Sequence, residues 1–274
     1  MSLRFRALGS GSTGNATLVE GGGVRVLVDA GLGPRQLRER LGSARVDPSS
    51  VDVVLLSHEH GDHARGAAAF SAKWGVPLAG TRGTWQAAGF GAEDLPGYQR
   101  IEPAEPLRLG GLIVQAVSVA HDAAGPVAYV LSAGKVSLGH ATDLGCIDRS
   151  LVQALRGCQA IFLEANFDPA MLRDGPYPWA LKERILGPFG HLSNGDVGRF
   201  LEQGMGEDCR QVVLAHLSQK NNHPELALFA AAEGLRRGGR RDVSLAVAGT
   251  EGTDWITVRP SGELRPEEGQ LRLF

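Results

Sequence analysis

Four potential metal ligands lie in one stretch of the sequence, Ser57-His58-Glu59-His60-Gly61-Asp62-His63, in the pattern His-x-His-x-Asp-His. The short, β-branched apolar run 51–56 precedes it and predicts a buried parallel strand. The alanine-rich run 64–70 follows it and predicts a helix. The stretch is therefore a loop at the carboxyl end of a strand, where open α/β sheets bind their ligands.

The spacing within this loop predicts two adjacent ions. His58 and His60 are two residues apart, so an extended segment points both to one face. Asp62 and His63 lie where the chain turns into the helix and face a second point nearby. The alternative is a polar loop that contains histidines by chance. With eight histidines in 274 residues, three beside an aspartate directly after a core strand favour a metal site.

Composition and charge describe an ordinary globular chain. Hydrophobic residues make up 43% and charged residues 21%, and 38 glycines fit many short loops. The net charge of −2 supplies no global basic field for nucleic acid, although a local groove would suffice. We expect one domain over 1–274, since no low-complexity linker divides the chain.

The N-terminal residues, the apolar runs and the cysteines indicate the cellular compartment. The N-terminal residues contain no apolar core of a signal peptide, and no apolar run reaches the ~18 residues of a membrane span. Cys146, Cys158 and Cys209 are widely spaced and form no CxxC, so neither disulfides nor a thiolate zinc site are expected. We expect a cytoplasmic protein without a membrane partner. The oligomeric state is left open.

A repeated pattern extends the site beyond the first loop: an apolar strand with a His, Asp or Glu at its carboxyl end. It occurs at His58, His121, Asp143, Glu164 and His216. Any one case is explained by the polar loop that every strand needs. Five cases predict a shared site along one sheet edge.

Periodicity and turn residues give the remaining elements. Strands are expected at 3–8, 16–20, 24–29, 77–80, 112–119, 127–131, 135–139, 160–163, 211–214, 243–247 and 255–258. Helices are expected at 34–41, 83–88, 147–155, 179–186, after Ser193 to 203, and at 224–235. The region 95–106 is expected to be a turn, and 166–190 to be irregular apart from its one helix. Ser193-Asn194-Gly195-Asp196 resembles a capping box.

These motifs together resemble the metallo-β-lactamase superfamily. The match continues in HDAAGPVAY at 121–129, TDLG at 142–145 and LAHLS at 214–218. The resemblance implies an α/β fold, a four-layer αββα sandwich with a dinuclear site between its sheets. It implies that one metal takes His58, His60 and His121, and the other Asp62, His63 and His216. Asp143 would bridge the two.

A narrower resemblance is to the YycJ/WalJ group, which is related to tRNase Z and RNase J. It is carried by 9–15 (GSGSTGN), 163–168 (LEANFD), 187–194 (GPFGHLSN) and 216–222 (HLSQKNN). The group implies a 5′→3′ DNA exonuclease and favours manganese. The chain has no block of residues for a β-CASP insertion, and no long glycine-rich arm like that of tRNase Z.

The expected chemistry is phosphodiester hydrolysis with two divalent ions, Mn²⁺ or Zn²⁺. A hydroxide shared by the metals would be the nucleophile, and the net positive site suits an anionic DNA or RNA substrate. Asp62, His191 and Glu164 are the candidate catalytic residues. The resemblance to tRNase Z makes His191 the proton donor and Glu164 its orienting partner. The alternative is that the loop around His191 only caps the following helix.

Substrate contacts are predicted at six polar residues. Ser193 and Asn194 offer N–H groups at a helix N-terminus. Ser12, Asn15, Ser218 and Asn221 are further candidates, each with a plain turn role as its alternative. The arginine-rich run 236–241 fits either a nucleic-acid backbone or a solvated helix end. Tyr177, Trp179 and Phe189 could line an entrance, but burial is the expectation for them.

Two other functions remain open. A small-molecule hydrolase, acting on a cyclic phosphodiester or a lactone, or an RNA nuclease, could use the same metal centre. A non-catalytic module whose metals only hold the fold is a third reading. The filling of all seven ligand positions argues against it, since a structural ion needs no open dinuclear site.

Overall fold

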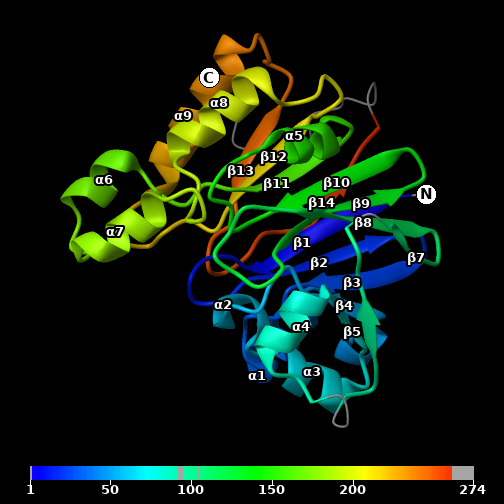
Figure 1. Ribbon diagram of the computed structural model, residues 1–274. Helices are drawn as coiled ribbons and strands as arrows, with labels where there is room; N and C mark the ends of the chain where they lie inside the picture. Colours follow the sequence, from blue (N-terminus) through cyan, green and yellow to red (C-terminus); the bar gives the residue numbers. More distant parts are fainter. Residues whose placement is uncertain (1, 92–94, 104, 261–274) are drawn as a thin grey trace.

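Two β-sheets pack face to face in the computed structural model, and helices cover both outer faces (Figure 1). The structure describes residues 2–91, 95–103 and 105–260. Within these residues each sheet has seven strands. This is the four-layer αββα sandwich that the sequence predicts, and the α/β fold class is confirmed. The predicted domain 1–274 includes residue 104 and the segment 261–274, which lie outside the described residues.

The first sheet carries the metal-binding loop. Its strand order is β14-β1-β2-β3-β4-β5-β6, and β3 to β6 run parallel. The strands are β1 Leu3–Gly9, β2 Ala16–Gly21, β3 Val24–Val28, β4 Val53–Leu55, β5 Leu78–Gly80, β6 Tyr98–Arg100 and β14 Ile256–Val258. The loop leaves β4, which is buried and pairs in parallel with both neighbours, as predicted.

The second sheet has the order β13-β12-β11-β10-β9-β8-β7. Its strands are β7 Leu107–Leu109, β8 Leu112–Ser118, β9 Val127–Ala133, β10 Val136–Ala141, β11 Ala160–Glu164, β12 Gln211–Ala215 and β13 Ser244–Val247. Strands β10 to β13 are parallel, and β9 is antiparallel to both β8 and β10. The carboxyl ends of β8, β10, β11 and β12 therefore share one edge.

Helices fill the two outer layers. They are α1 Pro34–Ser43, α2 Gly61–Ala64, α3 Ala67–Trp74, α4 Arg82–Ala88, α5 Arg149–Arg156, α6 Pro169–Asp174, α7 Trp179–Leu186, α8 Asn194–Gln203 and α9 Pro224–Arg237, with a 3₁₀ turn at Pro48–Ser50. Apolar residues of α1 and α3 pack on the first sheet, and those of α5, α8 and α9 on the second. Helices α6 and α7 project from one end of the sandwich (Figure 1).

The central core lies between the sheets and is built by alternating side chains. Phe5 of β1 meets Phe162 of β11 edge-to-face, with ring centroids 6.3 Å apart. Two polar contacts also cross the core. The Tyr129 hydroxyl donates to the Leu56 carbonyl at 2.6 Å, and His140 Nε2 lies 3.1 Å from Thr17 Oγ1. These bonds satisfy buried polar groups and set the alignment of the two sheets.

Some local predictions were wrong. The helix predicted at 64–70 is divided into α2 and α3 at Gly66, where a Cβ atom would lie 2.0 Å from the Leu32 carbonyl oxygen. The predicted turn region contains β6, and β7 follows it unpredicted. Helix α6 was also missed, although Asp168 caps it and a proline begins it. Short elements of this kind depend on neighbouring strands and caps more than on periodicity.

Candidate metal centre and active site

The strand-end residues meet where the edges of the two sheets face each other. His121, Asp143, Glu164 and His216 end or follow β8, β10, β11 and β12 of the second sheet. His58 follows β4 of the first sheet. The strand-end pattern predicted a site along one sheet edge, and this is corrected; ligand residues come from both sheets, as the family resemblance implies. Strand ends of one sheet lie in a row, and a loop from the facing sheet is needed to surround a point with ligands.

The first ligand group is His58, His60 and His121, whose ligand atoms lie within 4.8 Å of one another. His60 Nδ1 is 3.3 Å from His121 Nε2. The other ring nitrogens have protein partners: His58 Nδ1 lies 3.0 Å from Ser57 Oγ, and His121 Nδ1 lies 3.0 Å from the Gly190 carbonyl oxygen. Such partners select the tautomer in which Nε2 carries the free lone pair.

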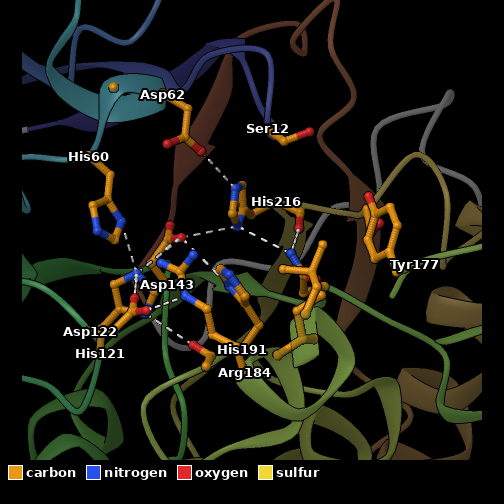
Figure 2. Close-up of a pocket in the computed structure, with 16 residues that line it drawn as sticks. Ser12, His60, Asp62, His121, Asp122, Asp143, Tyr177, Arg184, His191 and His216 are labelled. Carbon is orange, nitrogen blue, oxygen red and sulfur yellow. Dashed lines mark hydrogen bonds and ion pairs between the residues drawn. The ribbon is translucent and has the colours of Figure 1, made fainter. Parts of the chain in front are cut away.

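The second ligand group is Asp62, His63 and His216, again with ligand atoms within 4.8 Å. Asp62 Oδ2 lies 3.4 Å from His216 Nε2 and 3.7 Å from His63 Nε2. Asp62 and His216 point toward each other across the cleft (Figure 2). The structure thus brings together the three residues that the resemblance assigns to one metal.

Asp143 lies between the two groups. Its Oδ2 is 2.9 Å from His63 Nε2, and its Oδ1 is 3.8 Å from His121 Nε2. The backbone φ of Asp143 is +60°, and His216 has φ +53°. Left-handed backbone at non-glycine residues costs of order 1–3 kcal/mol each and is concentrated at functional sites. This conformation aims the Asp143 carboxylate at the space between the groups.

The sequence analysis missed Asp29, a buried carboxylate behind the second group. Its Oδ2 accepts from His63 Nδ1 at 2.8 Å, and its Oδ1 accepts from the Ser57 N–H at 2.8 Å. Asp29 follows β3, the parallel neighbour of β4, so the strand-end rule applied to the predicted strand 24–29 would have found it.

Glu164 is fully buried and holds two histidines. Its Oε1 accepts from Nδ1 of His191 at 2.7 Å and from Nδ1 of His216 at 3.0 Å. Its Oε2 accepts from the N–H groups of Leu144 at 2.9 Å and Leu192 at 3.1 Å. The pairing of Glu164 with His191 matches the prediction. The contact with His216 was not foreseen, and it links the pair to the second ligand group.

Neighbouring charges and burial shift the pKa values of Asp143, His191 and His58 in the site. Burial alone would raise the pKa of Asp143, but His216 and His63 hold it well below its usual value. Burial would lower the pKa of His191, yet the charge and hydrogen bond of Glu164 raise it above the usual value. Burial lowers the pKa of His58, and His63 lowers it further. His58 therefore keeps a lone pair for a metal ion.

These residues fit divalent metal ions. In the described part of the chain, His58 Nε2 is a buried atom without a hydrogen-bond partner, which costs free energy unless something else binds it. The donor set is imidazole nitrogen and carboxylate oxygen, which suits zinc or manganese. Cysteine is absent from every ligand group found among the described residues.

Five of the seven proposed ligands form the floor of a cleft of about 420 Å³, namely His60, Asp62, His121, Asp143 and His216 (Figure 2). The lining residues are Ser12, His60, Gly61, Asp62, His121, Asp122, Asp143, Asn166, Tyr177, Leu181, Arg184, Ile185, Gly190, His191, His216 and Ser218. This volume is in the range of small-molecule sites. Of the six predicted substrate contacts, Ser12 and Ser218 line the cleft.

Asn15 and Asn221 are buried and have contacts within the protein. Asn15 Oδ1 accepts from the Gly11 N–H at 2.8 Å, and its Nδ2 lies 3.0 Å from His63 Nε2. The Asn221 carbonyl accepts from the Asp168 N–H at 2.8 Å. Asn15 thus holds the 9–15 loop against the metal-binding loop, and Asn221 is buried and is not among the residues that line the cleft.

The capping box at the start of α8 is confirmed. The backbone N–H groups of Ser193 and Asn194, which were expected to bind phosphate, are already hydrogen-bonded within the protein. The Ser193 N–H donates to Asp196 Oδ2 at 3.0 Å, and the Asn194 N–H donates to the Phe167 carbonyl at 2.9 Å. Asn194 also exchanges amide hydrogen bonds with Asn222. Because both N–H groups have protein acceptors, we do not assign Ser193 and Asn194 to the substrate.

The arginine run is largely neutralised. Ion pairs join Arg236 to Glu233, Arg237 to Glu202 and Arg240 to Asp242. This supports the alternative of a solvated helix end.

Two of the three aromatic residues differ from expectation. Trp179 is 62% exposed and Phe189 58% exposed, so the prediction of their burial was wrong. Tyr177 is half-buried and lines the cleft. Trp179 begins α7, which projects beyond the sandwich where fewer elements cover it (Figure 1). Phe189 lies in the loop that follows α7.

Comparison with known families identifies this architecture. The model of the beta-lactamase superfamily domain matches residues 24–217, which include every predicted metal ligand. The chain belongs to the metallo-β-lactamase superfamily. With the donor set described above, this membership makes it a metal-dependent hydrolase.

Curated relatives cover most of the chain. It is 32% identical over 241 residues to exodeoxyribonuclease YycJ of Bacillus anthracis, covering 87% of this chain and 91% of the relative. It is 32% identical over 231 residues to exodeoxyribonuclease WalJ of Streptococcus pneumoniae, covering 83% and 86%. The predicted resemblance to this group is confirmed.

Solved structures show the same fold at low sequence identity. YhfI from Bacillus subtilis aligns with a TM-score of 0.70 at 17% identity, over 94% of this chain and 100% of that one. Zn²⁺-bound PqqB from Methylobacterium extorquens gives 0.68 at 17% identity, over 92% and 99%. Human tRNase Z, short form, gives 0.65 at 14%, over 93% and 99%. Among the described residues, no helix is long and apolar enough to cross a membrane.

Proposed function

We propose that this protein is a dinuclear metal-dependent phosphodiesterase that degrades DNA from the 5′ end. The observation that carries the proposal is the position of Asp143. It contacts His63 of one ligand group and His121 of the other, at the floor of a cleft that also contains His191. The two exodeoxyribonuclease relatives support the choice of DNA. The cytoplasmic location stays a prediction.

The proposed ligands are those of the two groups. One ion would be held by His58, His60 and His121, the other by Asp62, His63 and His216, with Asp143 between them. Divalent ions, when bound, supply positive charge for the phosphate and lower the pKa of a coordinated water. The donor atoms suit Mn²⁺ or Zn²⁺, and the group resemblance favours Mn²⁺.

His191 is the proposed proton donor to the leaving oxygen. Its Nδ1–H is held by Glu164 Oε1, which leaves Nε2 as the atom for proton transfer. Burial lowers the pKa of His191, but the charge and hydrogen bond of Glu164 raise it above its usual value, which favours the protonated form that a proton donor needs. Ser12 and Ser218, which line the cleft from two neighbouring loops, are the proposed polar contacts to the substrate.

One assay tests this function. The protein is incubated with 5′-labelled single-stranded DNA, with RNA and with bis-p-nitrophenyl phosphate, in Mn²⁺ or Zn²⁺, beside the Asp62→Ala variant. We expect wild-type protein to release nucleotides from the DNA and the variant to lose this activity. DNA left intact under both metals, while the small ester is cleaved, would refute the exonuclease.

A small-ester hydrolase on the same centre is the second candidate. It is favoured by the cleft volume of about 420 Å³ and by the ion pairs that neutralise the arginines of α9. RNA cleavage at a higher rate than DNA cleavage would instead favour an RNA nuclease. No cleavage of any substrate would favour metals that only hold the fold.

A further inference from the structure

One wall of the cleft comes from outside the sandwich. Tyr177 and three residues of α7, namely Leu181, Arg184 and Ile185, line the cleft opposite the metal-binding loop. Helices α6 and α7 form a separate projection at the end of the second sheet (Figure 1). Figure 2 shows Tyr177 and Arg184 facing the same space as His191 and His216. We call these four residues the α7 wall.

The α7 wall is held in place by its own contacts. The buried Lys182 donates through Nζ to the carbonyl oxygens of Arg173 at 2.7 Å and Gly175 at 2.8 Å, which ties α7 to α6. Ile185 forms a small core with Phe167 and Leu172, against which Tyr177 and Leu181 pack. The cleft-facing groups are therefore positioned before any substrate binds, which reduces the entropic cost of binding.

The α7 wall adds chemistry that the sandwich does not supply. Among the described residues that line the cleft, Arg184 is the only lysine or arginine, and Tyr177 is the only phenylalanine, tyrosine or tryptophan. Arg184 is 60% exposed at its side chain and donates through Nε to Asp122 Oδ2 at 2.5 Å. Asp122 Oδ1 in turn lies 3.4 Å from His121 Nε2. The guanidinium is thus fixed beside the first ligand group with its outer edge toward solvent.

We propose that the α7 wall recognises the terminal nucleotide of the substrate, with a base stacked on Tyr177 and a phosphate bound by Arg184. The inference rests on the proposed function and deepens it. A flat aromatic ring accepts any base by stacking, and a guanidinium binds phosphate through paired donors. Both groups share a cleft with the ligand groups, so a nucleotide whose phosphate lies at the floor reaches them. A substrate whose terminal residue lacks a base gains nothing from Tyr177.

The same projection supplies matched control residues. Trp179 is an exposed aromatic on α7 that does not line the cleft, within the residues described. Arg173 is an exposed arginine on α6 that pairs with Asp174, as Arg184 pairs with Asp122. Trp179→Ala and Arg173→Ala remove an aromatic ring and a guanidinium from the same projection at residues that do not line the cleft.

The test compares substrates with and without a base. KM and kcat are measured for 5′-labelled single-stranded DNA, for thymidine 5′-(p-nitrophenyl phosphate) and for the same DNA with an abasic 5′-terminal residue, and bound metal is measured in each variant. For Tyr177→Ala and Arg184→Ala we expect kcat/KM to fall about 10- to 100-fold on the two substrates that carry a terminal base, mainly through KM. Tyr177→Phe should retain wild-type values, because it keeps the ring.

For the abasic DNA we expect less than about threefold change in Tyr177→Ala, and metal content should equal that of wild type. The inference is overturned if Tyr177→Ala lowers all three activities together, if it changes none, or if Trp179→Ala has the same effect. Wild-type protein that cleaves the thymidine ester but not DNA would refute the exonuclease, and the variants would still test the α7 wall on the ester. Cleavage of no substrate would overturn both.

Discussion

Asp29 Oδ2 lies 2.8 Å from His63 Nδ1, and both side chains are buried. The carboxylate fixes the tautomer of His63, so that Nε2 faces Asp143 and Asp62. The same oxygen also accepts from the Ser57 hydroxyl at 2.9 Å, at the start of the metal-binding loop. Carboxylate–histidine pairs of this kind orient metal ligands and raise their basicity.

Removing this carboxylate should weaken the metal site. We expect Asp29→Ala to lower metal affinity about 10- to 100-fold, because His63 loses its orienting acceptor. Asp29→Asn is the matched variant: it keeps an acceptor for Nδ1–H, and asparagine tolerates the φ of +62° at this position. Titration with Mn²⁺ and Zn²⁺ measures both variants. Wild-type affinity in Asp29→Ala would contradict the role of Asp29.

If His191 is the proton donor, its removal should lower turnover without lowering metal binding. We expect His191→Ala to lower kcat about 10²- to 10⁴-fold while the metal content stays at the wild-type value. Elemental analysis and steady-state rates on the same preparation check this. If the metals are lost together with activity, His191 is a ligand or a structural residue.

Glu164 should behave differently from His191, since it also contacts His216. Glu164→Gln keeps the shape of the side chain but removes the charge, so we expect turnover and metal affinity to fall together. A variant that loses turnover alone would show that the His216 contact has no effect on the metal. Turnover and metal affinity are measured for Glu164→Gln and His191→Ala in one experiment, so that the two variants can be compared directly.

A substitution at Gly31 tests how closely the backbone packs against the metal-binding loop. A Cβ atom on Gly31 would lie 1.7 Å from the Asp62 carbonyl oxygen, so Gly31→Ala must displace backbone. We expect about 1–3 kcal/mol of destabilisation, measured by urea unfolding, and a lower metal content. Gly42→Ala is the control. Nothing lies within 4 Å of its Cβ position in α1, and stability should rise by about 0.5–1 kcal/mol. Equal stability of the two variants would refute the close approach.

The core histidine should make stability depend on pH. Burial lowers the pKa of His140 to about 4, below its unfolded value of 6.5. The unfolded chain therefore binds the proton more readily, and stability falls as pH drops below 6.5. Between pH 7 and pH 5 this group should cost about 2 kcal/mol. His140→Gln should lose less stability than wild type over that interval, as measured by urea unfolding at both pH values. An equal loss in both proteins would exclude His140.

Much of the candidate site was readable from local sequence. Side chains that end parallel strands of one sheet lie along its edge, so Asp143 and His216 could be placed near each other without coordinates, whereas His58 belongs to the facing sheet. The same reasoning reaches Asp29, but only once β3 is known to lie beside β4. Pairing between strands is a long-range contact, and one residue's neighbours along the chain do not specify it.

Local sequence could not show which backbone N–H groups are already hydrogen-bonded within the protein. Ser193 and Asn194 begin a helix as predicted, yet their N–H groups are bound by Asp196 and Phe167. Whether such a donor is free depends on which segment packs against it. The exposure of Trp179 depends in the same way on the projection of α6 and α7, where no sheet covers it among the described residues.

The sequence by itself determined the ligand types, their order and the alternation of strands and helices, because these follow from side-chain chemistry and from periodicity along the chain. Only the tertiary structure decided that Asp29 supports His63, that Glu164 contacts His191 and His216 together, and that Tyr177 and Arg184 share their cleft. Those relationships join residues far apart in the chain. They exist only after burial has fixed which surfaces face each other.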